Sequence, residues 1–344
     1  MTGLKQAAVV GGTGYGALEL IRILENHPFL ELTTVISQSE EGNDIGERYP
    51  HLQTIRTDSF KNMEAAAACD VIFIAAPAGV ASKLIPTLSA SKSQIIDLSG
   101  DLRLEDSDVY EAWYGLEPPD KAMQQHAVYG LPEVNRETIR EARLISNPGC
   151  FATAAILGMY PAVKQQLIEP GTIMMDGKTG VSGAGRKMSM MTHFSETNEN
   201  IKAYRTGAHQ HVPEIEEHLG KAAGIQTPVY LQTHLMPMTR GIMVTSYGRL
   251  AGSATELQQA YETAYEHEPF TRFRKSGLMP QTKDVYGSSY CDIGVFADER
   301  SGTLMTVAVI DNLMKGAAGQ AVQNCNIMNG WAEYSGLQMV PQYP

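Results

Sequence analysis

The stretch Ala7-Ala8-Val9-Val10-Gly11-Gly12-Thr13-Gly14-Tyr15-Gly16-Ala17 joins a short apolar run to a glycine-rich turn. Apolar residues then recur at helical spacing, beginning with Leu18 and Ile21. Strand, glycine-rich turn and helix in this order are the setting of a dinucleotide-binding turn, because glycines let the backbone approach a pyrophosphate at the helix N-terminus. The spacing here is G-x-x-G-x-x-A, and glycine-rich turns also occur without any nucleotide. With strand and helix both in place, we expect a parallel α/β domain that binds a dinucleotide.

Three further apolar runs have the composition of buried parallel strands: Leu32 to Ile36, Asp70 to Pro77 and Gln94 to Leu98. Ser37 and Ser39 follow the first of them, where an NAD-preferring site usually carries Asp or Glu. Hydroxyl groups at that point leave room for a 2′-phosphate. The pattern therefore favours NADP over NAD, although no arginine stands there and two glutamates follow.

Length, composition and charge restrict the class of protein. A chain of 344 residues is long enough for two domains, and 43% hydrophobic with 19% charged residues is ordinary for a soluble globular protein. The formal net charge of −11 argues against a nucleic-acid or anionic-membrane partner. No apolar run approaches the ~18 residues that a membrane span needs. We expect a small-molecule partner.

Cysteine usage and the N-terminal sequence predict the compartment. Met1 to Gln6 lead directly into the first strand without the pattern of a signal peptide. Cys69, Cys150, Cys291 and Cys325 lie far apart and form no C-x-x-C pair. This usage suits a reduced, cytoplasmic protein better than a disulfide framework or a zinc site. We therefore expect a cytoplasmic protein without a bound metal.

Cys150 is the candidate nucleophile. It lies in Ser146-Asn147-Pro148-Gly149-Cys150-Phe151-Ala152-Thr153-Ala154, where Pro-Gly supplies a turn and the residues from Ala154 to Tyr160 predict a helix. At the start of a helix, unpaired backbone N–H groups and the helix dipole favour a thiolate and can hold an oxyanion. The same position also suits a cysteine that is simply part of the core.

Two loops are candidates for holding an anion or a cofactor. Arg103 follows the run Gln94 to Leu98, and its guanidinium is either a bidentate anion clamp or part of an ordinary loop salt bridge. The glycine-rich basic segment from Lys178 to Lys187 either closes on cofactor or substrate or is only a flexible connection.

Two histidines can serve Cys150 as acid and base. His209 and His211 precede Glu214, and Pro213 is placed like the first residue of a helix. A His-x-His motif can also bind metal or be purely structural, but a catalytic cysteine needs a proton partner. If the segment is extended, the two side chains point in opposite directions and only one faces the sulfur; we favour His209 without a firm reason from the sequence.

The remaining patterns predict a second domain of a different type. Antiparallel strands are expected at Pro228 to His234, Gly241 to Leu250 and Thr303 to Asp311, after a strand at Thr172 to Asp176. A helix is expected near Glu256 to His267, and a final helix from Asn312 to Asn329 with small residues that allow close packing. The predicted fold is α/β: a Rossmann-type dinucleotide-binding domain (residues 1–149 with 313–344) and an α+β domain with a mostly antiparallel sheet (residues 150–312).

With these motifs in order, the chain resembles the N-acetyl-γ-glutamyl-phosphate reductases of arginine biosynthesis, relatives of aspartate-semialdehyde and glyceraldehyde-phosphate dehydrogenases. The resemblance spans nearly the whole chain, and the succession of its blocks is very specific. The blocks are Gly11 to Leu20, Asp97 to Arg103, Tyr129 to Glu133, Ser146 to Cys150, Gly180 to Arg186, His209 to Glu214, His234 to Gly241 and Asp311 to Asn326.

The resemblance implies NADPH-dependent reduction of N-acetyl-γ-glutamyl phosphate to the semialdehyde, with release of phosphate. Separately, a homo-oligomer (a dimer or a tetramer) is expected, because homo-oligomers are common and the antiparallel sheet can pair across a two-fold axis. Cys150 is then the nucleophile, and His209 or His211 is the acid/base. The expected substrate-binding residues are Arg103, Asn147, Lys178, Glu214 and Arg240. The expected cofactor-binding residues are Gly11, Thr13, Gly14, Tyr15, Gly16, Ser37, Ser39, Ala76, Pro77, Ser182, Gly183 and Asn312.

Departures and rival functions complete the prediction. Gln38 replaces an Arg expected for NADP, while Ala17 and Ala78 replace a Gly and a His seen in many relatives. None of these changes touches the proposed chemistry. One rival function is the homologous reductase of an aminoadipyl phosphate, one carbon longer; another is a non-catalytic nucleotide sensor, in which Cys150 would be inert.

Overall fold

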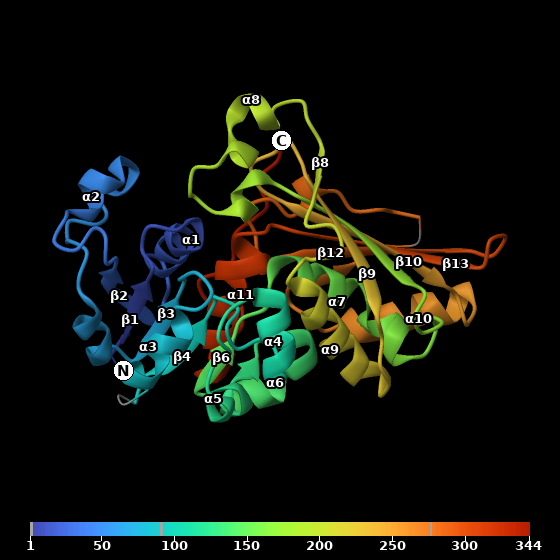
Figure 1. Cartoon of the computed structure of the whole chain (residues 1–344), viewed down its shortest axis with the longest axis horizontal. Helices are drawn as coiled ribbons and strands as arrows, with labels where there is room; N and C mark the ends of the chain where they lie inside the picture. Colours follow the sequence, from blue (N-terminus) through green and yellow to red (C-terminus); the bar gives the residue numbers. More distant parts are fainter. Residues whose placement is uncertain (1–2, 90–91, 276) are drawn as a thin grey trace. The chain divides into compact units, whose positions relative to one another are not determined.

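The computed structural model describes residues 3–89, 92–275 and 277–344 (Figure 1). The chain separates into two compact units. The first comprises Met1–Glu105, Leu116–Asn147 and Ala321–Leu337, and the second comprises Asp106–Gly115, Pro148–Gln320 and Gln338–Pro344. The predicted return of the last helix to the first unit therefore applies from residue 321 onward, whereas residues 313–320 and 338–344 belong to the second unit.

The first unit is built on a six-stranded parallel sheet with the order β2-β1-β3-β4-β6-β5. This confirms the Rossmann-type prediction. The strand order reverses between β1 and β3, and such a switch point is where doubly wound sheets bind ligands. The strands are β1 (Lys5–Val10), β2 (Leu30–Ile36), β3 (Val71–Ile74), β4 (Gln94–Asp97), β5 (Val128–Tyr129) and β6 (Leu144–Ser146).

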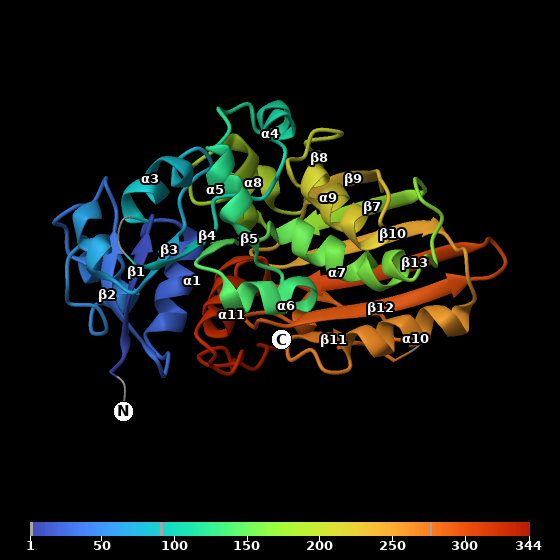
Figure 2. The same ribbon diagram turned by 90° about the horizontal axis from the view of Figure 1, so that it is seen from below.

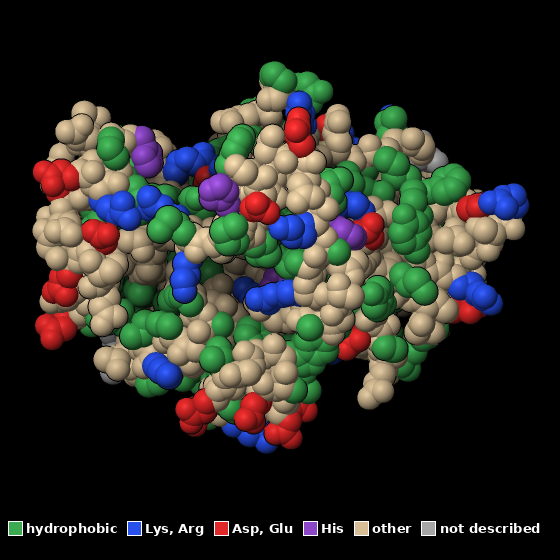
Figure 3. All heavy atoms as spheres, turned by 45° about the horizontal axis from the view of Figure 1, so that its top comes forward, with side chains coloured by type: hydrophobic (Ala, Val, Ile, Leu, Met, Phe, Trp, Pro, Cys, Tyr) green, Lys and Arg blue, Asp and Glu red, His purple; other side chains and the backbone are tan. Residues whose placement is uncertain are grey.

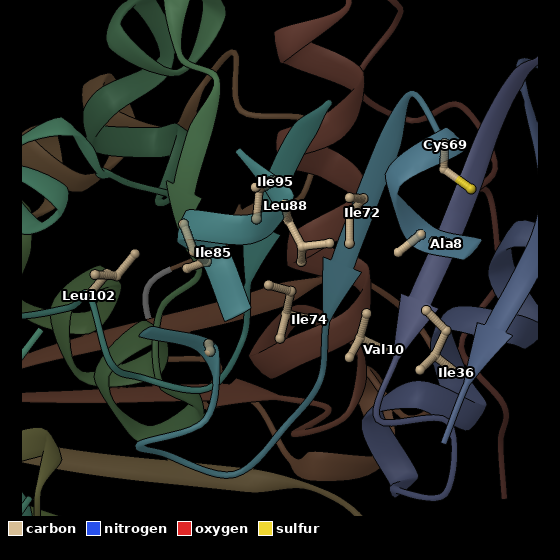
Figure 4. Packing of buried hydrophobic residues seen from close by; sticks show 12 residues of the cluster. Ala8, Val10, Ile36, Cys69, Ile72, Ile74, Ile85, Leu88, Ile95 and Leu102 are labelled. Atoms are coloured by element: carbon tan, nitrogen blue, oxygen red, sulfur yellow. The ribbon is translucent and has the colours of Figure 1, made fainter. Parts of the chain in front are cut away.

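Helices connect these strands. They are α1 (Tyr15–Leu24), α2 (Ile45–Arg48), α3 (Ala81–Leu88), α5 (Lys121–His126) and α6 (Pro132–Glu141), with the 3₁₀ segments η1 (Pro50–Leu52) and η2 (Met63–Ala68). The helix α11 (Gly319–Met328) ends the series. A buried cluster between the sheet and α3 holds the layers together (Figure 4). Strand residues such as Ile72 and Ile74 meet Ile85 and Leu88 of α3 there, and each such side chain contributes about 1.5–3 kcal/mol on burial.

The second unit contains a seven-stranded mixed sheet with the order β11-β12-β13-β10-β7-β9-β8. Four of its neighbouring pairs are antiparallel, which confirms the mostly antiparallel prediction; β7–β9 and β11–β12 are parallel. The strands are β7 (Ile173–Thr179), β8 (Lys202–Tyr204), β9 (Val229–Leu235), β10 (Ile242–Arg249), β11 (Thr271–Phe273), β12 (Cys291–Asp298) and β13 (Thr303–Ile310). The sequence patterns did not predict β8, β11 or β12.

Helices α7 (Cys150–Lys164), α9 (His211–Ala223) and α10 (Ala254–Tyr265) cover one face of this sheet (Figure 2). The unit also holds α4 (Ser107–Tyr114), α8 (Phe194–Thr197), the short 3₁₀ segments η3 (Val181–Ala184), η4 (Met190–Thr192) and η5 (Thr282–Asp284), and a π-helix, η6 (Met314–Ala318). Helix α7 is buried on nearly all sides. Tyr261 and Tyr265 of α10 donate hydroxyl hydrogen bonds of 2.6 and 2.5 Å to the carbonyls of Gly158 and Leu157 in α7. The helix that begins at Cys150 is therefore firmly anchored.

The opposite face of the sheet carries a row of large apolar side chains. Strand register places Tyr230, Met174, Tyr247, Met305 and Phe296 side by side across β9, β7, β10, β13 and β12. Four of them are 41–61% exposed. A contiguous exposed apolar row of this kind is typical of a protein–protein contact.

Basic and acidic side chains are interspersed on the face shown in Figure 3, rather than gathered into one basic surface. Within the described residues, none of the helices combines the length and apolar character that crossing a bilayer requires.

Candidate active site

The glycine-rich turn of the first unit lies at the switch point between β1 and β3. Gly11 has φ +87°, and a Cβ there would lie 2.4 Å from the Ala75 carbonyl oxygen, so this position requires glycine. The N–H groups of Gly11 and Gly12 donate to the Ile36 carbonyl at 3.0 and 2.8 Å. Gly14 is the N-cap of α1. The helix N-terminus needed for a pyrophosphate is thus formed. Thr13 lies in the turn, and Tyr15 is the first residue of α1. A Cβ on Gly16 would meet nothing within 4 Å.

The ends of β2 and β3 carry the other predicted cofactor residues. Ser37 is buried, and its hydroxyl lies 3.3 Å from that of Ser39; Ala76 and Pro77 follow β3. No arginine adjoins the serines in the sequence, but the fold brings Arg48 of α2 into an ion pair with Glu40 at 3.1 Å. The sequence pattern at the end of β2 did not predict this cation, because Arg48 lies several residues further along the chain.

Arg103 and Asn147 are tied to the backbone of the first unit. The Arg103 guanidinium donates to the carbonyls of Asn147 and Leu98 at 2.9 and 3.1 Å, and its side chain is buried. Asn147 is held further, because its N–H donates to the Asp97 carbonyl and its Oδ1 accepts from Asn324. These bonds fix the end of β6 just before the nucleophile turn. Substrate binding by the two residues stays a prediction.

Cys150 is the first residue of α7, as predicted, with Gly149 as N-cap. The Gly149 N–H donates to Oε1 of Glu214 at 2.7 Å, and Glu214 is fully buried. Predicted as a substrate ligand, Glu214 thus holds the nucleophile turn. Cys150 is half-buried, whereas the other three cysteines are buried. Burial raises the pKa of Cys325 to about 12.

The two histidines surround this turn. A Cβ on Gly149 would lie 2.3 Å from Nε2 of His211, so the imidazole edge packs directly against the residue before Cys150. The His211 N–H donates to Nδ1 of His209 at 3.1 Å, and the two ring centroids are 4.7 Å apart. Because Nδ1 accepts this bond, neutral His209 carries its hydrogen on Nε2.

The histidine segment is not extended. His211 is the first residue of α9, so Pro213 is its third residue, and the prediction of Pro213 as first residue is wrong. Burial, with a smaller contribution from the Arg205 charge, lowers the pKa of His209 to about 4. His209 is therefore neutral at pH 7. Within the described residues, no group of three His, Cys, Asp or Glu side chains is arranged to hold a metal ion.

Tyr204 at the end of β8 is a site residue that the sequence patterns did not predict. Its ring centroid is 6.1 Å from that of His209. Burial raises the pKa of Tyr204, and the negative charge of Cys150 raises it further. The aromatic ring of Phe151 also packs against His209, with their ring centroids 5.3 Å apart. No spacing rule in the sequence links Tyr204 to Cys150.

Hydrogen bonds join the predicted cofactor residue Asn312 to Ser182, another predicted cofactor residue, and to Gly241. Asn312 donates through Nδ2 to the Ser182 hydroxyl at 2.9 Å and accepts at Oδ1 from the Gly241 N–H at 2.7 Å. A Cβ on Gly183 would lie 2.9 Å from the Thr179 hydroxyl, so the loop is closely packed. The basic glycine-rich segment is thus fastened at Ser182 rather than loose throughout.

Two predicted substrate ligands already have partners. The Arg240 guanidinium pairs with the fully buried Asp311 at 3.0 Å. Lys178 pairs with Asp176 at 2.7 Å, and His234 lies 2.9 Å from the same carboxylate. Substrate binding by Arg240 and Lys178 stays a prediction, and either cation would have to share its partner.

The π-helix η6 supports Cys150 from another side. Asp311 accepts hydrogen bonds from the Leu313 and Met314 N–H groups at 2.9 and 3.2 Å and so caps this segment. A Cβ on Gly316 would lie 2.9 Å from the Cys150 Cβ. Short π-helical segments are frequent at functional sites. Here the widened turn brings a side-chain-free backbone against the nucleophile.

Comparison with known proteins places this site in a family. Residues 6–142 match the family model described as "Semialdehyde dehydrogenase, NAD binding domain", and residues 150–312 match "Semialdehyde dehydrogenase, dimerisation domain". The N-acetyl-gamma-glutamyl-phosphate reductase of Oceanobacillus iheyensis is 50% identical over 99% of this chain and 100% of that protein. That of Bacillus subtilis is 49% identical over 98% of this chain and 99% of that protein. The chain belongs to the N-acetyl-gamma-glutamyl-phosphate reductase family.

Solved structures share the fold of this reductase family member at low identity. Aspartate semialdehyde dehydrogenase II from Vibrio cholerae superimposes with a TM-score of 0.72 at 17% identity, covering 95% of this chain and 99% of that chain. Aspartate semialdehyde dehydrogenase with NADP from Candida albicans gives a TM-score of 0.70 at 15% identity, covering 95% and 98%. The predicted fold class and family resemblance are therefore confirmed.

The contact between Gly316 and Cys150 gives a first prediction for this reductase family member. Gly316→Ala should lower kcat roughly tenfold to hundredfold, because the new methyl group displaces a reacting side chain whose placement matters on the ångström scale. Steady-state kinetics together with circular dichroism will measure this. Gly158→Ala is the matched control in α7: its Cβ would lie 3.2 Å from that of Ala308 and should affect stability but not kcat. A wild-type kcat in Gly316→Ala would contradict the positioning role.

Proposed function

We propose that the protein reduces N-acetyl-γ-glutamyl phosphate to N-acetyl-L-glutamate 5-semialdehyde and phosphate, as a step of arginine biosynthesis. Family membership at about half identity over nearly the whole chain supports this activity. The observation that carries the mechanism is the half-exposed Cys150 at the N-terminus of α7, with His211 packed against the preceding glycine. The enzyme is an oxidoreductase that uses a nicotinamide dinucleotide.

Cys150 acts as the nucleophile in this proposal. Its thiolate attacks the acyl carbon, the S–C bond forms, and the C–O bond to phosphate breaks, which leaves a thioester and inorganic phosphate. The oxyanion that forms meets backbone N–H groups of the first turn of α7, because no carbonyl within the helix accepts them. The Gly149 N–H is not among these donors, since Glu214 accepts it.

The first unit is proposed to bind NADP. The turn at Gly11 suits a pyrophosphate, the hydroxyls of Ser37 and Ser39 leave room for a 2′-phosphate, and Arg48 adds a cation that already faces Glu40. When bound, the reduced nicotinamide supplies the hydride that converts the thioester to a hemithioacetal, which then releases the aldehyde and the thiol.

We propose His211, rather than His209, as the acid/base that protonates the hemithioacetal oxygen. The His211 ring edge lies against Gly149, one residue before the nucleophile. His209, with a pKa of about 4, remains neutral at neutral pH and accepts the His211 N–H. A neutral imidazole that already accepts the His211 backbone N–H is better suited to orienting His211 than to delivering a proton.

The activity is tested in the reverse direction. With N-acetylglutamate semialdehyde, inorganic phosphate and NADP⁺, the wild-type protein should form NADPH, and NAD⁺ should be used less well. Cys150→Ser should abolish turnover while binding NADPH normally, because only the nucleophile is lost. Absorbance at the NADPH band and cofactor fluorescence measure the two quantities.

Two further arms make this test decisive. The semialdehyde one methylene longer should give a lower kcat/KM; a pocket distinguishes one methylene by only ~1–3 kcal/mol, so a reversed preference would assign the aminoadipyl substrate. Iodoacetamide should modify one thiol, since Cys150 alone among the four is not buried, and should react well below the ordinary thiol pKa of ~8.5. An inert thiol without turnover would instead favour a nucleotide sensor.

The histidine assignment gives a separate prediction. His211→Ala should lower kcat by roughly 10²–10⁴, as expected for loss of a general acid/base, and should remove one limb of the pH–rate profile. His209→Ala should lower kcat less and leave the apparent pKa values of the profile in place. Profiles of kcat/KM against pH for both variants measure this. The reverse pattern would transfer the role to His209, and two unchanged profiles would exclude both histidines.

We further propose a homo-oligomer that forms through the open face of the seven-stranded sheet, in the cytoplasm. The row Tyr230, Met174, Tyr247, Met305 and Phe296 is apolar and exposed across five strands. The family model matched by residues 150–312 carries the description of a dimerisation domain. A two-fold axis would pair this face with its own copy. Four unlinked cysteines support a reducing compartment.

Tyr247→Asp should split this oligomer into smaller species, because a charge at the centre of an apolar contact loses its hydration on association. Sedimentation velocity at micromolar concentration will measure the mass. Ile225→Asp is the matched control: Ile225 is 52% exposed in the turn after α9, outside the row. An unchanged mass for Tyr247→Asp would remove the sheet face as the interface.

A further inference from the structure

We propose that Arg205 binds a negatively charged group of the acyl phosphate and is a specificity-determining residue of the second unit. The inference rests on the proposed function, and neither the family models nor the sequence patterns point to this residue. Its basis is a combination of position, backbone conformation and unbalanced charge.

Arg205 lies in the short loop that joins β8 to α9. It follows Tyr204, whose ring contacts that of His209, and precedes His209 by four residues. The Ala208 N–H donates to the Arg205 carbonyl at 3.0 Å and closes the turn. The guanidinium Nη1 donates to the side-chain oxygen of Gln210, so the Arg205 side chain runs back alongside His209.

The backbone at Arg205 is held in an unfavourable conformation. Its φ is +49°, in the left-handed region that non-glycine residues rarely adopt. Such conformations cost on the order of 1 kcal/mol, and they persist where the surroundings impose them, often at functional sites. Gly207, two residues later, takes φ +66° without steric penalty. The loop therefore keeps the Arg205 backbone in a conformation that raises the free energy of the folded state, and this conformation sets the direction of the side chain.

The charge of Arg205 has no counter-charge. Within residues 3–89, 92–275 and 277–344, its hydrogen-bond partner is the neutral amide of Gln210, and no carboxylate lies within ion-pair distance. Lys178 and Arg240, the other cations considered for the substrate, are paired with Asp176 and Asp311. The Arg205 charge nevertheless acts electrostatically on His209, because it contributes to the lowered pKa of that residue.

The substrate supplies the missing anion. An N-acylated glutamyl phosphate carries a phosphoryl group at the reacting end and a carboxylate at the other end. A guanidinium pairs with either group through parallel N–H···O bonds. Arg205 is held by the neutral amide of Gln210 and acts electrostatically on His209, so it keeps its charge and several donors for that purpose.

The reverse reaction separates the two anions, because phosphate and the semialdehyde carboxylate then enter on different molecules. Arg205→Gln should raise the KM of one of the two substrates roughly tenfold to hundredfold, as expected for loss of a charged hydrogen bond. The kcat and the KM of NADP⁺ should change little. A raised phosphate KM assigns the phosphoryl group to Arg205, and a raised semialdehyde KM assigns the carboxylate. Arg205→Lys should recover part of the loss.

Arg300→Gln is the matched control for net charge. Arg300 is 87% exposed at the turn between β12 and β13 and faces Asp298, so its loss should leave both KM values unchanged. Unchanged KM values for phosphate and semialdehyde in Arg205→Gln, or a fall in kcat alone, would overturn the inference.

Equilibrium binding separates this inference from the proposed function. Calorimetric titration with inorganic phosphate and with N-acetylglutamate, on the wild type and on Arg205→Gln, requires no turnover. If the wild type lacks reductase activity but Arg205→Gln lowers the affinity for one of these ligands, the anion site is supported and the proposed reaction is rejected. Equal affinities in both proteins would refute the anion site, whatever the activity.

Discussion

The hydrogen bond from the Gly149 N–H to the buried Glu214 carboxylate is the constraint on which the catalytic unit depends. It joins the starts of two helices, α7 and α9, that are 61 residues apart in sequence. A buried carboxylate without its partner costs the full penalty of desolvation, so any rearrangement of the nucleophile turn is opposed by roughly 1–3 kcal/mol or more. The same bond sets the His211 ring against Gly149, because His211 and Glu214 share the first turn of α9. The nucleophile and its proposed proton partner are therefore fixed by one interaction.

Close backbone contacts complete the surroundings of Cys150. Gly149 admits the His211 ring, Gly177 admits the Phe151 ring at 2.6 Å from a would-be Cβ, and Gly316 admits the Cys150 Cβ. These glycines come from the nucleophile turn, from β7 and from the π-helix, so three elements converge on the first turn of α7. None of the three positions requires a positive φ. Glycine is needed there for space, and mutations that add a single methyl group act directly on the reacting atoms.

The sequence predicted the parts of this site that depend on local pattern. The turn at Gly11 and the helix start at Cys150 follow from glycine, proline and apolar periodicity over a few residues, and both are confirmed. The start of α9 was misplaced because its N-cap, Gln210, makes no side-chain cap. Strand β12, Tyr204 and Gly316 were missed for another reason: their roles arise from pairing or contact with residues far away in the chain. Sequence patterns over a few residues cannot predict such contacts.

The chain passes from the first unit to the second just before the nucleophile. The chain leaves the first unit after Asn147, whose backbone is held by Asp97 and Arg103 at the end of β6. It enters the second unit at Pro148, and Glu214 holds the very next residue. Proline fixes its own φ and restricts the residue before it, so few rotatable dihedrals separate the two anchors. Cys150 therefore belongs to the second unit by packing.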